Sequence, residues 1–298
     1  MTDLEIPTGS YVFMKDKARS LEAQRTIWMY WNRGLKQAPD LVHICVESWH
    51  KRNPEWNFCV LDDTTLHDWL DMTDVRARNP RLTIQAYSDI LRWRLLAQYG
   101  GVWADATLYC AKPLDSWLAS NVTPDGFFVF RSPEAHLYHS WFLVGHPGNP
   151  VVKIMKAELD RFFIFYDGYR HYWDIRGVWR FYRLIERFAG RYNHQIWRSH
   201  FFRKYLKATP YFFQNYLTGA AISRSREAFD DFLSLTMKFG EEPHALQNMT
   251  QTNVCPSLET VRELLDGPCP MQKLTTKRFV AEWNDGGVLK LLDDYNRG

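Results

Sequence analysis

The sequence predicts an α/β fold in which helices cover a β-sheet. Strand-like and helix-like segments alternate from residue 26 to residue 70, the order of a parallel sheet with helices on its faces. Further along, a helical pattern ends at a double glycine, and a short apolar strand and an aspartate follow it. The chain has 298 residues, of which 46% are apolar and 24% charged, so it can bury the full core of a globular protein.

The elements of the first part follow in order. The run at 26–31 (TIWMYW) is rich in β-forming side chains and ends at a turn, which predicts the first strand. A helical pattern begins at Pro39 and stops before Asn53-Pro54, because a residue that precedes proline disfavours the helical conformation. A second strand is predicted at 57–61 and a second helix at about 64–70.

The segment from Ser88 to Cys110 is the centre of the prediction. Its apolar residues recur at helical spacing up to Tyr99, and Gly100-Gly101 then ends the helix, because glycine tolerates the left-handed conformation of a C-terminal cap. Residues 102–104 form a short buried strand, and residues 108–110 are again extended.

Three polar residues of this segment are candidates for chemistry. Asp105 follows the buried strand directly, and open α/β sheets bind ligands at the carboxyl ends of their strands. Asp89 and Arg92 are three residues apart, so they share a helix face and can point at the same crevice.

The second part of the chain is mainly helical, aromatic and rich in arginine. Strands are predicted at 127–131 and 139–144, and helices at about 150–163 and 288–295. Residues 161–207 carry eleven Lys and Arg but only three Asp and Glu. Arg176, Arg180, Arg183 and Arg187 form one helical stripe, which indicates either an interfacial membrane helix or an ordinary surface helix with solvated arginines.

Composition excludes several classes of protein. A net charge of +3 argues against a nucleic-acid-binding domain, which is usually strongly basic. The five cysteines are scattered without a C-x-x-C pair, so neither a zinc site nor a disulfide framework is predicted, and a reducing cytoplasm is expected. Neither a signal peptide nor an apolar run long enough to span a membrane is predicted.

Several motifs in order carry a family resemblance. S-D-x-x-R, Y-G-G-x-W and D-A-T at 88–107, S-W-F at 140–142, P-H-A-L-Q at 243–247 and Q-K-L at 272–274 resemble the capsular polysaccharide synthesis glycosyltransferases. That family is related to the DXD-containing sugar transferases of family 32. The resemblance implies a GT-A fold: a Rossmann-like mixed sheet with helices on both faces, and a helical acceptor-side part. We expect one domain over 1–298, with a nucleotide-sugar-binding core at about 26–150 and the acceptor side at about 151–298.

The resemblance also implies roles for individual residues. It implies three catalytic residues: Asp105, Asp89 and Arg92. It implies that the donor is bound by Tyr30, Trp31, Ser88, Asp89, Arg92, Trp103 and Lys273. Trp31 best matches the position that stacks on the nucleotide base, although the three aromatic residues Trp28, Tyr30 and Trp31 could equally fill the core. Ser140 and Trp141 would lie near the acceptor, or on a plain edge strand.

A metal ion, Mn²⁺ or Mg²⁺, would neutralise the leaving diphosphate. Its predicted ligands are Asp105, Thr107 and His244, with His244 either a contact to the metal or to a phosphate, or a structural residue. Thr107 stands where the family usually has a second aspartate, and a hydroxyl is a weaker ligand than a carboxylate.

The predicted function is that of a glycosyltransferase of surface or capsular polysaccharide synthesis, retaining the anomeric configuration. The donor would be a nucleotide sugar, such as a UDP-sugar, and the acceptor a saccharide or a lipid-diphosphate-linked saccharide. The protein would be cytoplasmic, with peripheral contact to the inner membrane face through the helix at 176–187, and would bind no nucleic acid. The alternatives are an inactive nucleotide- or sugar-binding module, and a sugar-phosphate transferase or nucleotidyltransferase of similar fold.

Overall fold

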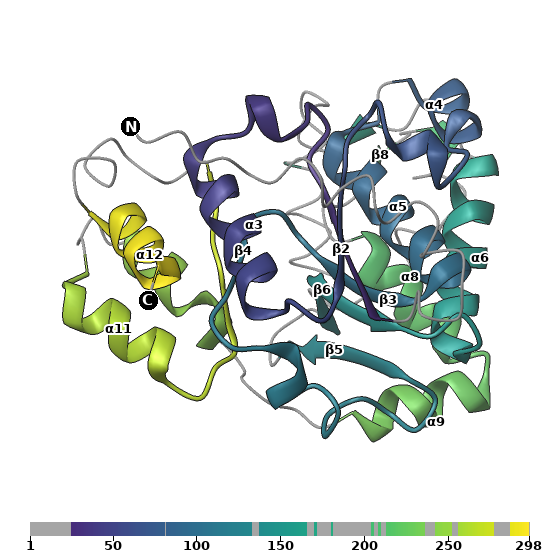
Figure 1. The fold of residues 1–298 in the computed structure, drawn as a ribbon. Coiled ribbons are helices and arrows are strands. Elements are labelled where there is room, and N and C mark those ends of the chain that lie inside the picture. Colours follow the sequence, from purple (N-terminus) through teal and green to yellow (C-terminus); the bar gives the residue numbers. More distant parts are fainter. Residues whose placement is uncertain are drawn as a thin grey trace.

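A five-stranded mixed sheet forms the centre of the molecule. The computed structural model describes residues 25–80, 82–132, 137–165, 170–171, 180, 204–205, 208–209, 213–235, 242–251, 256–276 and 287–297. The strands of the sheet, in spatial order, are β2 (Asn57–Leu61), β1 (Thr26–Tyr30), β3 (Gly101–Ala104), β6 (Tyr138–Gly145) and β5 (Phe127–Arg131) (Figure 1). β1 is parallel to β2 and β3, whereas β6 is antiparallel to β3 and β5. The mixed sheet is therefore confirmed, and β1 and β2, the two strands predicted within 26–70, are parallel as their order indicated.

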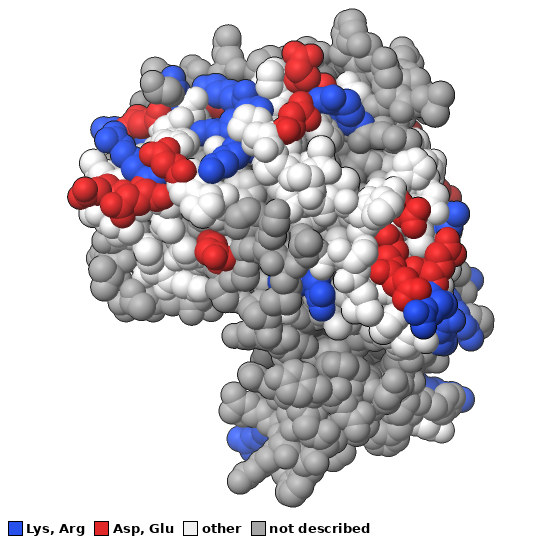
Figure 2. All heavy atoms as spheres, turned by 90° about the horizontal axis from the view of Figure 1, so that it is seen from below, with Lys and Arg blue, Asp and Glu red and all other residues white. Residues whose placement is uncertain are grey.

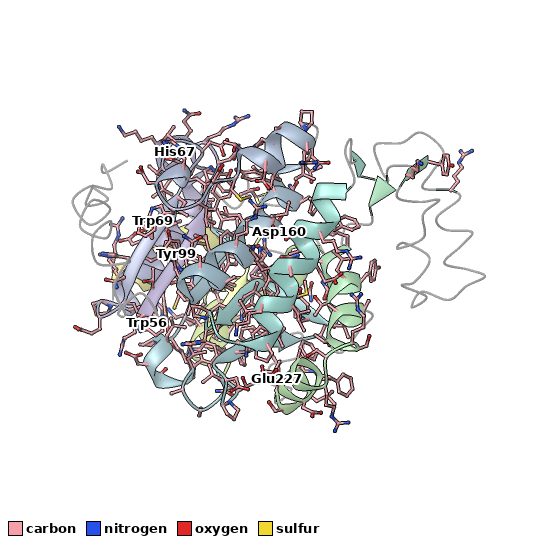
Figure 3. All side chains as sticks on the ribbon, turned by 90° about the vertical axis from the view of Figure 1, so that its right-hand side faces the viewer. Trp56, His67, Trp69, Tyr99, Asp160 and Glu227 are labelled. Atoms are coloured by element: carbon pink, nitrogen blue, oxygen red, sulfur yellow. The ribbon has the colours of Figure 1, made fainter. Side chains whose placement is uncertain are left out.

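Helices cover both faces of this sheet (Figures 1 and 3). One face carries α5 (Ile84–Tyr99), α6 (Pro150–Phe165) and α8 (Phe213–Ile222), with α5 packed directly on β3 and β6. The other face carries α3 (Asp40–Arg52). Trp93 of α5 stacks on Phe127, with ring centroids 6.4 Å apart, and Trp49 of α3 stacks on Phe142 at 6.0 Å. Burial of each such ring contributes roughly 1.5–3 kcal/mol, so these stacks fix the helices on the sheet.

A smaller second core lies beside α3. Two short strands, β4 (Leu108–Cys110) and β9 (Met271–Lys273), pair antiparallel outside the main sheet. Around them pack α10 (Ala245–Gln251), α11 (Leu258–Asp266) and α12 (Val288–Arg297). Arg52 and Tyr109 both bond the Asn296 side chain, at 2.9 and 2.8 Å, and so fix α12 on this core. The pairing of β4 with β9 brings residues of the carboxyl-terminal part to the end of β3.

The remaining elements are short. They are α4 (Thr73–Arg78), α9 (Arg226–Ser234), the two-residue strands β7 (Arg170–His171) and β8 (Ala208–Thr209), and the 3₁₀ turns η2 (Leu35–Gln37), η3 (Leu66–Asp68), η4 (Leu114–Ser116) and η8 (Glu242–His244). On the face seen in Figure 2, described acidic and basic side chains lie intermingled in groups near the edges. No helix in the described ranges is long and apolar enough to cross a bilayer.

Two local predictions need correction. The helix expected at 64–70 is only the 3₁₀ turn η3, because the Asp62 carboxylate accepts hydrogen bonds from the backbone N–H groups of Thr64 and Thr65 and closes a turn there. The strand that carries Ser140 and Trp141 is not an edge strand, since β6 lies between β3 and β5. Of the predicted basic stripe, Arg176, Arg183 and Arg187 lie outside the described residues, and Arg180 is exposed.

The double glycine ends α5 as the sequence predicts. Gly100 and Gly101 have φ angles of 70° and 98°, which residues with a side chain rarely adopt. A Cβ atom at position 101 would also lie 2.4 Å from the Thr26 carbonyl oxygen of β1. The Trp28 indole N–H donates to the Gly100 carbonyl at 2.9 Å, so this tight turn is bonded to the first strand.

We therefore expect Gly101→Ala to lower the free energy of unfolding by about 2–5 kcal/mol, the sum of backbone strain and overpacking. Thermal unfolding followed by circular dichroism measures it. Gly219→Ala in α8 is the matched control, because its Cβ would meet only the end of the Leu137 side chain, at 3.0 Å. An unchanged melting temperature for Gly101→Ala would contradict this account of the turn.

Candidate active site

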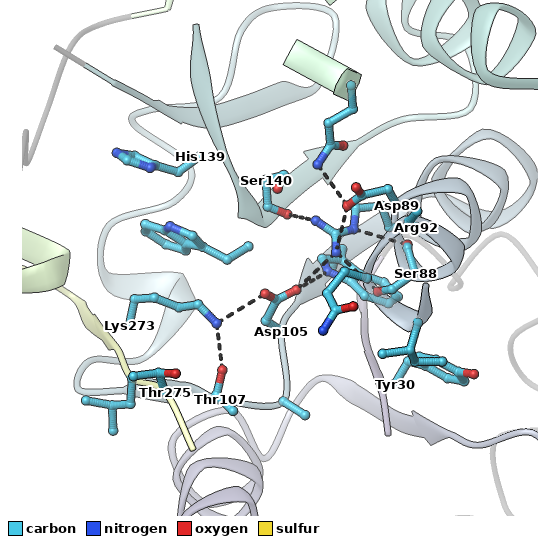
Figure 4. A pocket seen from close by; sticks show the side chains of 18 of the residues that line it. Tyr30, Ser88, Asp89, Arg92, Asp105, Thr107, His139, Ser140, Lys273 and Thr275 are labelled. Carbon is cyan, nitrogen blue, oxygen red and sulfur yellow. Dashed lines mark hydrogen bonds and ion pairs between the residues drawn. The ribbon is translucent and has the colours of Figure 1, made fainter. Parts of the chain in front are cut away.

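A pocket of about 760 Å³ opens at the carboxyl ends of β1 and β3. Its volume is within the range of small-molecule sites. All the predicted site residues line it: Tyr30, Trp31, Ser88, Asp89, Arg92, Trp103, Asp105, Thr107, His244 and Lys273 (Figure 4). They come from elements far apart in the sequence, and the sheet, α5 and β9 bring them to one place.

The Arg92 guanidinium lies at the centre of a buried charge network. Its side chain is only 5% exposed, and it forms ion pairs with Asp89 at 3.2 Å and with Asp105 at 3.4 Å. It also donates to the backbone carbonyls of Ser88 and Ser140, at 3.2 and 2.5 Å, and to the Ser88 hydroxyl at 3.1 Å. Arg92 thus ties α5, the residue after β3, and β6 together on one side of the pocket.

Asp105 is held as a carboxylate. Its Oδ1 accepts a hydrogen bond from the Trp103 indole N–H at 3.0 Å, and its Oδ2 lies 3.2 Å from the Lys273 ammonium. Burial alone would raise the pKa of Asp105, but Lys273 and Arg92 outweigh it and hold the pKa below its usual value. About a quarter of this side chain, 26%, stays exposed to the pocket. Asp105 is therefore an anion that a ligand can reach.

Asp89 has the opposite environment. Its side chain is only 9% exposed, and its Oδ1 accepts a hydrogen bond from the Gln214 amide at 2.8 Å. Burial raises the pKa of Asp89 to about 7, with Arg92 opposing the rise and Asp105 adding to it. The two carboxylates of the pocket therefore titrate in different ranges, which is the arrangement that separates their roles.

Lys273 is fixed against the D-A-T motif by strand pairing. It pairs with Leu108 in the register of β4 and β9, and the next residue donates its N–H to the Thr107 carbonyl at 2.9 Å. The Lys273 ammonium donates to the Thr107 hydroxyl at 2.6 Å as well as to Asp105 (Figure 4). An ammonium group thus bridges the two predicted metal ligands of this motif.

The third predicted ligand, His244, packs among aromatic rings. Its ring centroid lies 4.8 Å from that of His139 and 5.5 Å from that of Trp141. Burial and then Lys273 lower the pKa of His244 to about 4, so it is neutral at pH 7. In the part of the chain that the structure describes, no three His, Cys, Asp or Glu side chains gather as a metal site. Mg²⁺ is usually held by one or two carboxylates together with waters and substrate phosphates. Here the Asp105 carboxylate and the Thr107 hydroxyl both already accept from the Lys273 ammonium, so the residues in this arrangement do not fit such an ion.

Comparison with known proteins shows the family to which this chain belongs. The profile of the capsular polysaccharide synthesis protein family matches residues 8–187, which is more than half of the chain. The chain belongs to the capsular polysaccharide synthesis protein family. The matched residues include β1, β3 and α5, and therefore Arg92, Asp105 and most of the residues that line the pocket.

Two curated relatives of this family member are glycosyltransferases by name. Glycosyltransferase afumC of Aspergillus fumigatus is 29% identical over 149 residues, which is 43% of this chain and 38% of the relative. O-glycosyltransferase braB of Annulohypoxylon truncatum is 22% identical over 150 residues, 44% of this chain and 36% of the relative. The chain thus matches little more than a third of the length of these relatives. Among solved structures, PaToxG glycosyltransferase aligns over 96% of this chain and 95% of its own, with 13% identity and a TM-score of 0.37.

Tyr30 and Trp31, the two candidates for stacking on the nucleotide base, differ in their surroundings. The Tyr30 hydroxyl donates to Asp63 at 2.5 Å, and burial followed by that bond raises the pKa of Tyr30. Tyr30 is 7% exposed and packs against Tyr87 of α5. Trp31 lies just beyond β1 and is only partly buried. Of the two pocket residues, Trp31 is therefore the less buried.

The sequence analysis missed two residues of the pocket. Gln214 and Asn215 lie in the first turn of α8 and line the pocket, and none of the motifs named in the sequence analysis includes them. Gln214 bonds both Asp89 and the Trp93 indole N–H, and Asn215 accepts from the Tyr138 backbone N–H at 3.1 Å. The signal in the sequence was the adjacent amide pair itself, because buried amides require partners.

Ser140 and Trp141, predicted either near the acceptor or on an edge strand, do line the pocket. The Trp141 ring stacks between Phe130, at 5.0 Å and 29°, and His139, at 5.4 Å and 25°. Its indole N–H is buried and has no hydrogen-bond partner among the described residues. The His139 and Trp141 rings therefore form an aromatic side of the pocket, and the Trp141 N–H is buried within it.

Proposed function

We propose that this protein is a glycosyltransferase that moves a sugar from a nucleotide-sugar donor to a saccharide or lipid-diphosphate-linked saccharide acceptor. The observation that carries the proposal is the pair of pocket groups Asp105 and Lys273, an anion and a cation 3.2 Å apart at the carboxyl end of β3. A cation beside a carboxylate suits a donor that has a diphosphate at one end and sugar hydroxyls at the other. Family membership and the names of the two relatives support the reaction class.

The reaction is a substitution at the anomeric carbon of the donor sugar. The bond from that carbon to the diphosphate oxygen breaks, and its electron pair leaves with the diphosphate. The acceptor hydroxyl oxygen forms the new bond from the same face, and its proton passes to the departing phosphate oxygen. We therefore propose retention of configuration, which nuclear magnetic resonance of the product's anomeric proton tests.

Each group of the pocket has a proposed part in binding the donor. Lys273 contacts the diphosphate, Asp105 accepts from sugar hydroxyls, and the partly exposed Trp31 ring stacks on the base. Arg92 is 5% exposed and directs its donors to protein atoms, so it acts as a positioning residue that holds Asp105. Asp89 in turn pairs with Arg92 at 3.2 Å.

The acceptor approaches from the side of His139, Trp141 and His244. Their rings lie within 4.8–5.5 Å of one another and form one wall of the pocket. The partly exposed rings of His139 and His244 can pack against the C–H faces of a sugar. The inner-membrane contact predicted for the basic helix at 176–187 falls on residues mostly outside those described and stays a prediction.

The test is a panel of nucleotide sugars assayed for hydrolysis and transfer. Slow release of free sugar from at least one UDP-, GDP- or CDP-sugar is the expected result. A protein that binds these nucleotides but turns over none of them would be the inactive binding module, and the proposed activity would be wrong. Release of pyrophosphate from a sugar phosphate and a nucleoside triphosphate would instead indicate the nucleotidyltransferase.

We expect the affinity for the donor that this panel selects to rise as the pH falls from 8 to 6. Because burial raises the pKa of Asp89 to about 7, Asp89 is ionised at pH 8 and protonated at pH 6. Arg92, Asp105 and Tyr138 are the other charged or titratable groups that act on it. Loss of one negative charge from the pocket favours a diphosphate by roughly 1 kcal/mol, or about fivefold in affinity.

Isothermal titration calorimetry at pH 6, 7 and 8 measures this change. The control is Asp89→Asn, which keeps the shape of the side chain but cannot ionise. Its affinity should be flat over this range and should match that of the unchanged protein at pH 6. An equal pH dependence in both proteins would assign the effect to another group.

A further inference from the structure

Among the residues that the structure describes, the Lys273 ammonium is the cation that contacts Asp105 Oδ2. Lys273 donates to Asp105 Oδ2 at 3.2 Å and to the Thr107 hydroxyl at 2.6 Å, while Asp105 Oδ1 is occupied by Arg92 and Trp103. Both carboxylate oxygens and the hydroxyl of the D-A-T motif are therefore already engaged by donors. A divalent ion at this place would have to displace the ammonium.

The position of Lys273 is built into the fold. The lysine pairs in register with Leu108, the residue after Thr107, and the backbone bond from Leu274 to Thr107 closes the same ladder. Its side chain is 16% exposed, so the ammonium is largely removed from water yet lines the pocket. Gln272 stays buried on the opposite side of β9 and bonds the backbone N–H of Leu246, at 3.1 Å, which fixes the strand.

The charges of the network balance without a metal ion. Arg92 and Lys273 supply two positive charges, and Asp89 and Asp105 supply two negative charges when both are ionised. A diphosphate that enters beside Lys273 meets an ammonium with three N–H donors, of which two go to Asp105 and Thr107. The third can be directed to a phosphate oxygen.

We infer that Lys273 is the resident cation of this site, in the place between Asp105 and Thr107 where a divalent ion would lie, and that donor binding and cleavage are independent of metal. This inference rests on the proposed function. When the bond between the anomeric carbon and the diphosphate oxygen breaks, the electron pair stays on that oxygen. Lys273 donates a hydrogen bond to the diphosphate and keeps its proton, and the acceptor proton still passes to the departing oxygen.

The first test measures nucleotide binding with and without metal. UDP, with GDP in a parallel series, is titrated into the full chain by calorimetry in EDTA and in Mn²⁺. We expect at least one of these nucleotides to bind with affinities that agree within about threefold in the two conditions. Lys273→Met should weaken binding in EDTA roughly ten- to a hundredfold, the effect of one lost charged hydrogen bond, and Lys273→Arg should keep most of it.

Lys156→Met is the matched control, because this exposed lysine of α6 pairs with Asp160 away from the pocket. Its nucleotide affinity should equal that of the unchanged protein. Near-ultraviolet circular dichroism shows whether each variant keeps its fold. If Lys273→Met does not fold, the comparison of EDTA with Mn²⁺ in the unchanged protein still decides the question.

The outcomes separate this inference from the proposed function. Nucleotide binding or turnover that requires Mn²⁺ would overturn the role of Lys273 and leave the glycosyltransferase standing. Failure to bind any nucleotide in either condition would overturn both. Metal-independent nucleotide binding without any turnover would support the role of Lys273 as the resident cation and contradict the proposed glycosyltransferase activity.

A second test exchanges the two kinds of cation. The double variant Thr107→Asp with Lys273→Ala removes the ammonium and restores a second carboxylate at the motif. We expect it to bind Mn²⁺ in the absence of nucleotide, seen as loss of the free-ion signal in electron paramagnetic resonance, whereas the unchanged protein does not. A folded double variant without affinity for Mn²⁺ would contradict the inference that the Lys273 ammonium lies where a divalent ion would lie.

Discussion

Replacement of Asp105 by asparagine is expected to lower kcat roughly a thousandfold, a loss typical of a charged group that acts on the transition state. Asparagine keeps the size of the side chain but cannot hold Lys273 and Arg92 by charge, and Lys273 Nζ and Arg92 Nη2 both lie within 3.4 Å of the carboxylate. Because the pocket then loses one negative charge, its net charge becomes more positive, and the affinity for a nucleoside diphosphate should stay equal or rise. The loss should therefore appear in kcat and not in KM.

Steady-state kinetics with the donor selected by the panel measure both constants. Asp115→Asn is the matched control, because Asp115 also pairs with an arginine, Arg25, but is 56% exposed and lies outside the pocket. Its kcat should stay within about twofold. A folded Asp105→Asn protein with full kcat would remove Asp105 from the reaction and with it the centre of the proposed mechanism.

Local chemistry was enough to predict where Asp105 lies. Glycine is the residue that adopts the φ angles of 70° and 98° at positions 100 and 101, so the end of α5 and the start of β3 follow from the sequence. A short strand then delivers Asp105 to the carboxyl edge of the sheet, and helical spacing places Asp89 and Arg92 on one face. These relations span fewer than twenty residues, and each depends on backbone geometry alone.

Contacts between segments that are far apart in the sequence were harder to predict. Lys273 entered the prediction only through family resemblance, and its bond to Thr107 joins residues 166 positions apart through the pairing of β4 with β9. Nothing in the periodicity of three-residue strands specifies such a partner. Gln214 was missed for the same reason, since its bond to Asp89 spans 125 positions.

The errors within single elements have local causes. The predicted helix at 64–70 failed because the Asp62 side chain, which bonds two backbone N–H groups, offers the chain a turn in place of a helix. The prediction of an edge strand at Ser140 and Trp141 of β6 was wrong because the alternation of side chains along a strand does not indicate how many neighbouring strands it has. Its partners β3 and β5 are both antiparallel to it, which the strand–helix order of the first part does not indicate.

The largest effect on stability is expected from Arg92→Met. The variant fills the same buried space but leaves Asp89, 9% exposed, without its ion-pair partner. Removal of one member of a buried ion pair costs about 3–5 kcal/mol, which for a chain of this size lowers the melting temperature by roughly 6–10 °C. Arg226→Met is the control: its side chain is 87% exposed in a surface pair with Asp230, and its melting temperature should change by about 1 °C or less.

The pH dependence identifies the cause of this loss. Since the folded-state pKa of Asp89 is raised already with Arg92 present, it rises further without it, and an ionised Asp89 destabilises the fold as the pH increases. The deficit of Arg92→Met should therefore be larger at pH 8 than at pH 6. The double variant Arg92→Met with Asp89→Asn should recover part of it at pH 8, because no buried charge is left unpaired there. An equal deficit in the single and double variants at both pH values would mean that Arg92 stabilises the fold through its bonds to Ser88 and Ser140 and not through charge.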